Sequence, residues 1–276
     1  MLVCTDYTVS KEEFQIQECN NCGFWFTNPR PAENEIGAYY KSEDYISHTN
    51  SKKGLFNNVY QMARSVTIRN KFNLVNSITH GKNLLDYGCG TGEFLNYCDN
   101  HGMTVTGFEP DPDARAVGKQ SYQLNLLSEE DLFALPSSNF DVITLWHVLE
   151  HVHRLKETIG HLERMLRPDG ALLVAVPNHT SLDAKLYGEH WAAYDVPRHI
   201  YHFQPNDIRH LFSQFNMEMV EALPMKLDSY YVSMLSERYK KGNVVRAMLN
   251  GLRSNLSASS EALTWSSQIY ILKKKR

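Results

Sequence analysis

The chain has 276 residues, 42% of them apolar and 21% charged, which excludes a disordered or collagen-like protein. Its formal net charge of −3 provides no basic field for nucleic acid, and a sparse, odd count of five cysteines argues against a disulfide framework. No apolar run reaches the length of a membrane span, about 18 residues, and the N-terminus does not look like a signal peptide. We therefore expect a cytoplasmic protein.

Residues 1–80 are polar and rich in aromatic side chains, and we expect them to form an N-terminal cap. Strand-like runs at 14–18 and 24–27 flank Cys19 and Cys22, a spacing similar to one knuckle of a zinc ribbon. A ribbon needs a second cysteine pair, but only Cys4 lies upstream, so three thiolates would leave a zinc tetrahedron open.

The rest of the cap is predicted to be a helix at about 55–78, preceded by aromatic residues that either cover a ligand or simply pack. These residues are Tyr39, Tyr40, Tyr45 and His48.

From residue 81 onward, apolar strand-like runs alternate with helical patterns. The predicted strands are 83–87, 104–109, 122–126, 140–146, 171–176, 217–225 and 265–272. Such alternation predicts right-handed βαβ units, and so an α/β fold with a Rossmann-like, seven-stranded, mostly parallel sheet and helices on both faces. We assign 81–276 to this domain, with a lid at 179–204 and a helical insert at 228–261.

A glycine-rich turn follows the first strand of this domain. Asp86 is followed by Gly88, Gly90 and Gly92, a G-x-G-x-G spacing that differs from the G-x-G-x-x-G of dinucleotide-binding folds. The acid would repel a phosphate but can accept hydrogen bonds from an ammonium group. Taken alone, the glycines fit a plain tight turn equally well.

Glu109 ends the next strand, 17 residues after Gly92. An acid at this point can accept hydrogen bonds from both hydroxyls of a ribose. The alternative is that Glu109 caps the next helix, but Asp111 and Asp113 already suit that role. Asp86, the glycines and Glu109 together predict a site for a nucleoside that carries an amino-acid tail.

Four motifs resemble, in order and spacing, those of class I S-adenosylmethionine-dependent methyltransferases. They are DYGCGTG at 86–92, FEP at 108–110, FDVI at 140–143 and LRPDG at 166–170. The resemblance covers about 80–225, and 265–272 resembles the family's last, antiparallel strand. It implies in-line methyl transfer from S-adenosyl-L-methionine to a small-molecule acceptor, with O-methylation favoured and a base needed only when the nucleophile carries a proton.

The resemblance also implies roles for single residues. The cofactor-binding candidates are Asp86, Gly88, Cys89 and Gly90 for the methionine end, Glu109 and Pro110 for the ribose, Asp131 and Leu132 for adenine, and Trp146 beside the methionine. For Asp131 and Leu132, an acid-rich helix start is the alternative interpretation.

His147, Glu150 and His151 stand at i, i+3 and i+4, so a helix would place them on one face. In the quinone-pathway O-methyltransferases, a similar Glu-x-x-Glu-His segment is linked to a divalent metal, and two His with a carboxylate also suit one. Hydrogen bonds that brace the loop explain the same residues, and we predict no metal. His147 is a candidate general base for an acceptor hydroxyl, or a structural residue.

The lid contains Arg198 and His199, in a segment that resembles a Pro-Arg-His-x-x-x-Phe pattern of a bacterial branch of the family. Arg198 is expected to hold an acidic group and His199 to act as a base; the alternative is a lid whose polar groups pair internally. Because lid and cap are rich in Tyr, Trp and His, the acceptor is expected to have an apolar or aromatic body.

Two other functions are open to the sequence. A nicotinamide-dependent oxidoreductase is disfavoured by the G-x-G-x-G spacing and by Asp86. A non-catalytic cofactor-binding scaffold is disfavoured because Asp86, Gly88, Gly90 and Glu109 are all present. The oligomeric state is left open.

Overall fold

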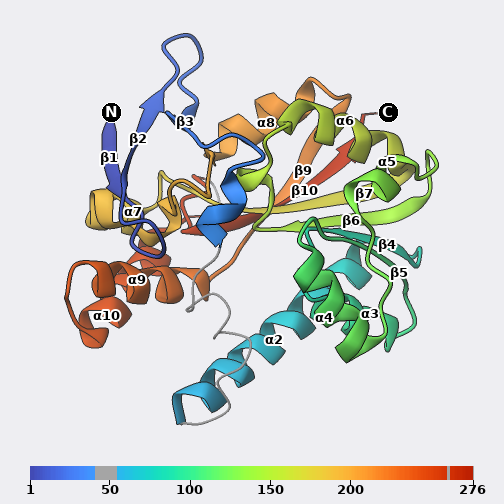
Figure 1. Ribbon diagram of the computed structural model, residues 1–276, viewed down its shortest axis with the longest axis horizontal. Coiled ribbons are helices and arrows are strands. Elements are labelled where there is room, and N and C mark those ends of the chain that lie inside the picture. Colours follow the sequence, from blue (N-terminus) through green and yellow to red (C-terminus); the bar gives the residue numbers. More distant parts are fainter. Residues whose placement is uncertain (41–54, 260–261, 276) are drawn as a thin grey trace.

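The computed structural model describes residues 1–40, 55–259 and 262–275, with side chains described from residue 64 in the second range (Figure 1). Tyr45 and His48 lie outside the described residues. Six strands form the larger sheet, in the order β5-β4-β6-β7-β10-β9. Their bounds are β4 Asn83–Tyr87, β5 Thr104–Phe108, β6 Phe140–Trp146, β7 Leu166–Pro177, β9 Met217–Pro224 and β10 Ser267–Lys274.

The strands from β5 to β7 pair in parallel, and β10 runs antiparallel to both β7 and β9, as expected for the last strand. Helices cover both faces, and each face has its own hydrophobic core. These helices are α2 (Leu55–Ile78), α3 (Glu93–Asp99), α4 (Pro112–Tyr122), α5 (Glu129–Phe133), α6 (Leu155–Met165) and α8 (Pro205–Ser213).

Alternate side chains of the buried strands enter the two cores. Along β7, Leu172 and Val174 belong to one core, while Leu173 between them belongs to the other. The continuous apolar run of this strand is therefore explained by burial on both faces.

The short third strand predicted at 122–126 is absent, so the larger sheet has six described strands rather than seven. Helix α4 extends to Tyr122, Gln123 then takes a left-handed conformation with φ 59°, and the chain makes a single parallel bridge between Leu127 and Phe108. The strand β7 also begins earlier than predicted, because α6 ends at Met165 and the buried Leu166 pairs with Phe140. The apolar stripe of α6 and the strand share this leucine, which hides the boundary in the sequence.

A smaller sheet joins the N-terminal segment to the predicted lid. Its order is β1 (Leu2–Thr5), β2 (Glu13–Glu18), β3 (Trp25–Thr27) and β8 (Tyr201–His202). Trp25 pairs with His202, and the Thr27 hydroxyl donates to the His199 carbonyl at 2.7 Å. Cap and lid, separate in the sequence-based division, are thus hydrogen-bonded to each other.

Cys4 does not complete a zinc ribbon with Cys19 and Cys22. It is buried on β1 opposite Phe14, whereas Cys19 follows the far end of β2. Five residues of strand separate the two positions, about 16 Å at the usual rise of ~3.3 Å per residue. That distance is far beyond what a single metal ion can bridge.

Two helices, α9 (Asp228–Tyr239) and α10 (Val244–Ser257), lie between β9 and β10, in the segment assigned to the helical insert. It packs against α7 (Leu182–Tyr187) of the lid. A search of the described helices finds none with the length and apolarity of a membrane-spanning segment.

Asp183 of α7 holds lid, insert and sheet together from a fully buried position. Its carboxylate accepts hydrogen bonds from the Trp191 indole (2.8 Å), the Ser254 hydroxyl of α10 (2.6 Å) and the Ser266 hydroxyl just before β10 (2.6 Å). Three buried donors depend on this one acid.

We predict that Asp183→Ala lowers the free energy of unfolding by about 3 kcal/mol or more, because each orphaned buried donor costs ~1–3 kcal/mol. Urea denaturation measures it, with Asp169→Ala at an exposed position as the control. Equal stability of the two variants would contradict this view of the network.

Candidate active site

Asp86, Glu109 and Trp146, three of the predicted cofactor residues, lie at the carboxyl ends of three parallel strands. Asp86 of β4 pairs in register with Gly107 of β5 and Thr144 of β6. Glu109 follows β5 directly, and Trp146 is the last residue of β6. Parallel pairing therefore brings side chains that are distant in sequence to one sheet edge, where ligands of such folds bind.

The glycine turn is anchored to the neighbouring strand, because the amides of Gly88 and Cys89 donate to the Phe108 carbonyl at 2.8 and 3.0 Å. Gly88 has φ 74°, and a Cβ there would lie 2.6 Å from a methyl group of Val148. At Gly90, with φ 57°, a Cβ would instead point into open space. The turn thus packs tightly on one side and leaves Gly90 accessible to a ligand.

Glu109 is buried and joins the end of β5 to the glycine turn. One carboxylate oxygen accepts from the Gly90 amide at 2.8 Å and the other from the Asp111 amide at 3.0 Å. Burial raises the pKa of this carboxyl, and the two amides oppose the shift. Pro110 beside it is exposed, and its carbonyl accepts from Arg115 at 2.8 Å.

Asp86 is only 3% exposed and accepts a hydrogen bond from the Thr144 hydroxyl at 2.6 Å. Burial raises its pKa to about 7, although Thr144 and the charge of Lys71 both lower it. A carboxyl in this state has too few partners to hold its charge fully at neutral pH. A bound cation would supply the missing partner.

Lys71 of α2 is a site residue that the sequence did not reveal. Its ammonium lies 4.4 Å from the centre of the Trp146 ring and interacts electrostatically with Asp86 and Asp228. Burial lowers its pKa, and the two acids oppose this. Nothing in the polar pattern of α2 distinguishes this lysine, because only the packing of the helix brings it to the sheet edge.

Asp131 and Leu132 have local contacts of their own. The carboxylate of Asp131 accepts from the amide and hydroxyl of Ser128, at 3.2 and 2.8 Å, and so closes a capping box at the start of α5. Leu132 is buried in the core with Tyr87 and Phe108. These contacts match the alternative interpretation of an acid-rich helix start, and the adenine role of both residues stays a prediction.

Two other candidates border the glycine turn. Trp146 is half-buried and lies edge-on to Phe94, with ring centres 5.7 Å apart. Cys89 is half-buried, and desolvation raises the pKa of its thiol, so the thiol is neutral rather than a nucleophile, and its contact with the cofactor stays a prediction.

His147 has an unusual backbone for a residue other than glycine, with φ 58°. Its Nε2 lies 3.0 Å from a carboxylate oxygen of Asp228, and its Nδ1 lies 3.5 Å from one of Glu150. Burial opposes its charge, but these two acids outweigh burial and raise the pKa of His147 to about 9. An imidazole that is protonated at neutral pH cannot take another proton, which argues against His147 as the general base.

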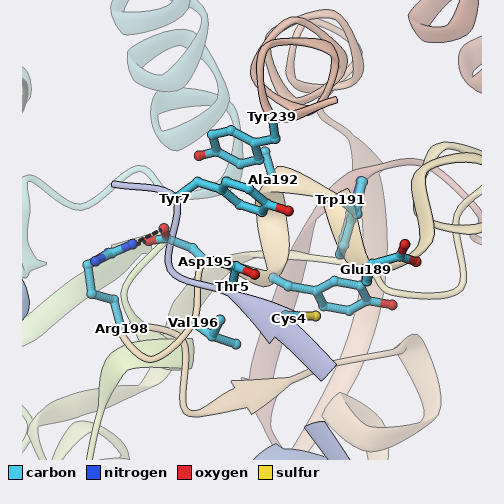
Figure 2. Close-up of a pocket in the computed structure, with 11 residues that line it drawn as sticks. Cys4, Thr5, Tyr7, Glu189, Trp191, Ala192, Asp195, Val196, Arg198 and Tyr239 are labelled. Atoms are coloured by element: carbon cyan, nitrogen blue, oxygen red, sulfur yellow. Dashed lines mark hydrogen bonds and ion pairs between the residues drawn. The ribbon is translucent and has the colours of Figure 1, made fainter. Parts of the chain in front are cut away.

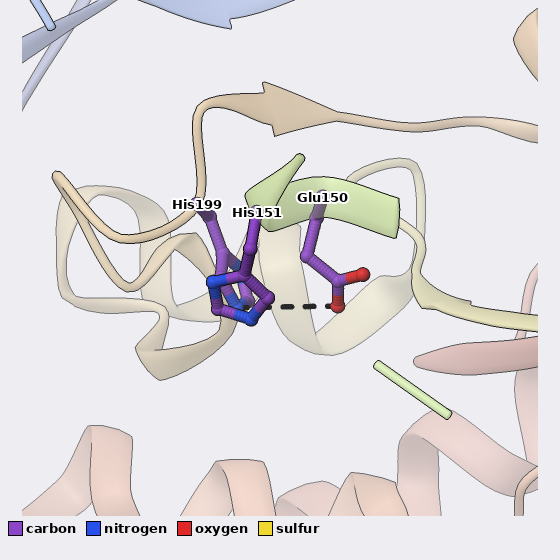
Figure 3. A group of neighbouring side chains, drawn as sticks. All are labelled: Glu150, His151 and His199. Carbon is purple, nitrogen blue, oxygen red and sulfur yellow. Dashed lines mark ion pairs between the residues drawn. The ribbon is translucent and has the colours of Figure 1, made fainter. Parts of the chain in front are cut away.

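Glu150, His151 and His199 form a compact group (Figure 3). The segment is a short 3-10 turn, Leu149–His151, rather than the helix that the spacing suggests. Glu150 is 1% exposed; its nearest partners, His147 Nδ1 at 3.5 Å and His199 Nε2 at 4.0 Å, lie beyond ordinary hydrogen-bond distance. Burial acts to raise the pKa of Glu150, but the three surrounding histidines lower it.

His151 has a different environment from its neighbours. Its Nδ1 lies 2.9 Å from the Tyr40 hydroxyl and 3.0 Å from the Arg198 carbonyl, and its ring meets that of His199 edge-on. Burial and the charge of His199 lower its pKa to about 4, so it stays neutral. A carboxylate with two imidazoles is also a ligand set that divalent metals accept, and the expectation of no metal stays a prediction.

Arg198 pairs with internal groups instead of facing the acceptor. Its guanidinium donates to Asp195 (3.0 and 2.6 Å), to Asp6 of the N-terminal segment (3.0 Å) and to the Tyr39 carbonyl (2.9 Å). Burial disfavours its charge, but the two acids outweigh this and raise its pKa further. The predicted role in holding an acidic acceptor is thus replaced by a structural one, because internal acids already occupy the guanidinium.

His199 follows Arg198 directly, and a hydrogen bond to the backbone fixes the orientation of its ring. Its Nδ1 lies 2.9 Å from the Ala193 carbonyl, which can only accept, so in a neutral ring Nδ1 carries the proton. Nε2 is then the free acceptor, 4.0 Å from oxygens of both Glu150 and Asp195. This is the orientation of a buried base flanked by acids.

A hollow of about 230 Å³ lies between β1 and the lid (Figure 2). Tyr7, Trp191 and Tyr239 line it, together with Asp195 and Arg198. Part of this volume is open to solvent, and no residue of the glycine turn lines the hollow. We therefore regard it as a packing gap between cap and lid rather than the cofactor site.

Comparison with known proteins agrees with this geometry. The model of a family described as "Methyltransferase domain" matches residues 60–222. The ubiquinone biosynthesis O-methyltransferase of Glaesserella parasuis is 30% identical over 163 residues, covering 52% of this chain and 68% of the relative. The malonyl-[acyl-carrier protein] O-methyltransferase of Serratia marcescens is 30% identical over 146 residues, covering 52% of this chain and little more than half (56%) of the relative.

Solved structures share the fold. A SAM-dependent methyltransferase from Archaeoglobus fulgidus aligns with TM-score 0.51 and 21% identity, over 77% of this chain and 94% of that one. Magnesium protoporphyrin IX methyltransferase from Synechocystis, with bound SAH, aligns with TM-score 0.55 and 14% identity, over 86% and 97%. The chain belongs to the methyltransferase-domain family, and its predicted place among class I S-adenosylmethionine-dependent methyltransferases is confirmed.

The raised pKa of His147 predicts a pH-dependent contribution to stability. A histidine that titrates at about 9 when folded, against an ordinary value of 6.5, stabilises the fold fully below pH ~6.5 and loses this effect as pH rises through 9. Because the side chain is one-third exposed, we expect about 1–2 kcal/mol after allowance for solvent screening.

The measurement is the difference in unfolding free energy between the wild type and His147→Gln. It should shrink between pH 6.5 and 9.5. A difference that is constant or grows over this interval would show that His147 is neutral in the folded protein.

Proposed function

We propose that the protein transfers a methyl group from S-adenosylmethionine to an oxygen of a small apolar or aromatic acceptor. The observation that carries the donor assignment is the electrostatic interaction between buried Asp86, at the end of β4, and Lys71 of α2. An amino-acid tail has one ammonium and one carboxylate, so it offers an opposite charge both to Asp86 and to Lys71. The cytoplasmic location remains part of this proposal.

Asp86 and Lys71 would hold the two ends of that tail. A ligand ammonium near Asp86 restores the charge of a carboxyl whose pKa burial raises to about 7. Lys71 would meet the ligand carboxylate while its stem and ammonium stay on the Trp146 ring. The accessible Gly90 allows the close approach of the ligand to the backbone.

Glu109 would bind the ribose. Each carboxylate oxygen has two lone pairs, and the Gly90 and Asp111 amides occupy one on each. One acceptor position per oxygen is therefore available for the two ribose hydroxyls. The same amides hold the carboxylate in a fixed orientation before the ligand arrives.

His199 is the residue best placed to act as general base. S-adenosylmethionine supplies an electrophilic methyl group, so the chain has only to orient the acceptor, exclude water and remove a proton. Nε2 of His199 would take the proton of an acceptor hydroxyl, and Glu150 and Asp195, each 4.0 Å away, would stabilise the resulting imidazolium. The positive His147 holds Glu150 ionised for this purpose.

The preference for oxygen rests on this base and on the relatives, two of which are named as O-methyltransferases. A nitrogen or carbon nucleophile without a proton to lose would need no such group. The nicotinamide oxidoreductase and the non-catalytic scaffold gain no support from the family match. The acceptor class is tested by incubating the protein with labelled methyl donor and either low-molecular-weight extract or nucleic acid; label in nucleic acid alone would overturn the proposal.

Glu109→Ala is expected to weaken S-adenosylhomocysteine binding by ~1.5–3 kcal/mol, the usual value for hydrogen bonds to a charged group. Isothermal titration calorimetry measures it, with Glu130→Ala, exposed on α5, as the matched control. Unchanged affinity of Glu109→Ala would remove the ribose assignment.

His199→Ala is expected to lower turnover ~10²–10⁴-fold while donor affinity changes little, because the base acts only on the acceptor. His179→Ala is the matched control. This second lid histidine is half-buried and stacks on Trp25, with ring centres 4.4 Å apart. If His199→Ala lowers thermal stability but not turnover, the lid histidine is only structural.

A further inference from the structure

Helix α10 exposes its large apolar residues and buries its small ones. Ala247, Asn250, Gly251 and Ser254 face the protein and are buried. The opposite side carries the exposed residues Val244, Val245, Met248, Leu249, Leu252 and Leu256, the last of them 76% exposed. Ordinary surface helices show the reverse arrangement.

Specific contacts hold the helix in this orientation. A Cβ on Gly251 would lie 3.0 Å from the Tyr230 backbone of α9, so only glycine permits this close approach. The Ser254 hydroxyl donates to Asp183 at 2.6 Å, and the Asn250 amide donates to the Tyr187 hydroxyl at 3.0 Å. A rotation that buried the leucines would break all of these contacts.

The exposed side is a continuous surface. At ~100° per residue, the six apolar side chains fall within an arc of about 140°, along a helix ~21 Å long. Figure 1 shows α9 and α10 at one edge of the molecule, beyond the lid and the end of the larger sheet. We call residues 244–256 on this side the apolar face of α10.

The charged residues of α10 and of the turn that precedes it are all cations. Arg246 and Arg253 lie along one edge of it, and Lys240 and Lys241 precede the helix; all four are exposed. The sequence from 240 to 259 contains no Asp or Glu. One acid from α9, the buried Glu237, lies 3.3 Å from Arg246, which is nevertheless 62% exposed.

We infer that the apolar face of α10 binds the surface of a membrane that contains anionic lipids. A helix of this type lies in the membrane plane, with apolar residues in the acyl boundary and cations among the headgroups. A second copy of the chain fits less well, because facing two such helices would bring cations against cations. Helix α10 packs on α9, which begins at Asp228, the partner of His147.

Vesicle flotation tests the inference without any need for methyl transfer. The full chain should bind vesicles of equal parts phosphatidylcholine and phosphatidylglycerol, bind pure phosphatidylcholine more weakly, and lose the difference at high salt. Absence of binding to the mixed vesicles would overturn the inference.

Variants separate the apolar and electrostatic parts. L249S/L252S/L256S should reduce binding about tenfold or more, because it removes most of the inserted apolar area. V66S/V117S/V220S changes three valines of comparable exposure on other elements and should bind as the wild type does. K240Q, K241Q and R253Q should each weaken binding about five-fold.

Light scattering and circular dichroism complete the test. The inference predicts that L249S/L252S/L256S keeps the wild-type fold and oligomeric state while it loses vesicle binding. A wild-type dimer that this variant converts to a monomer, with no vesicle binding by either, would instead assign the face to a second copy. Equal vesicle binding by both serine variants would equally overturn the inference.

Discussion

The candidate site depends on the parallel register of β4 with its two neighbours. This pairing aligns Asp86 with Gly107 and Thr144, so that the ends of three strands meet at one edge. Burial there gives Asp86 its raised pKa and brings it into the field of Lys71. The glycine turn packs against Val148 and donates hydrogen bonds to the Phe108 carbonyl. Gly90 has no neighbour at its Cβ position and is open to a ligand.

The part of the site assigned to the methyl acceptor depends on a second interaction, the ion pairs of Arg198 with Asp195 and Asp6. One guanidinium fastens the N-terminal segment to the lid, with the two acids balancing its charge. The next residue, His199, is thereby held against Glu150, which in turn is paired with the positive His147. Cap, lid and insert thus contribute jointly to one charged group beside the sheet edge, although each lies in a different part of the sequence.

Much of the fold could be predicted because the strands of the larger sheet are marked in the sequence by continuous apolar runs between turns. The strands at 83–87 and 140–146 are observed with the predicted bounds, since apolar runs and glycine turns delimit them. The segment 122–126 has a similar pattern, but it begins at the last residue of α4, and the next residue, Gln123, has a left-handed backbone conformation instead of a strand conformation.

The site could be predicted only where its residues follow strands. Asp86 and Glu109 are located by their positions near the end of β4 and directly after β5. Lys71 and Asp228 come from helices whose packing no local pattern specifies, and the internal pairing of Arg198 depends on Asp6, which is 192 residues away. Sequence motifs are local, so they cannot predict contacts between segments that are this far apart in the chain.

The central claim is that buried Asp86 receives the ammonium of the donor's amino-acid tail. Because its pKa is about 7 in the free protein, binding of S-adenosylhomocysteine at pH 7 should release a proton, and affinity should rise between pH 6 and 8. Calorimetry in two buffers of different ionisation enthalpy measures this release directly. The account predicts a fractional proton released by the wild type and none by Asp86→Asn; equal proton release by both, or none by the wild type, would contradict it.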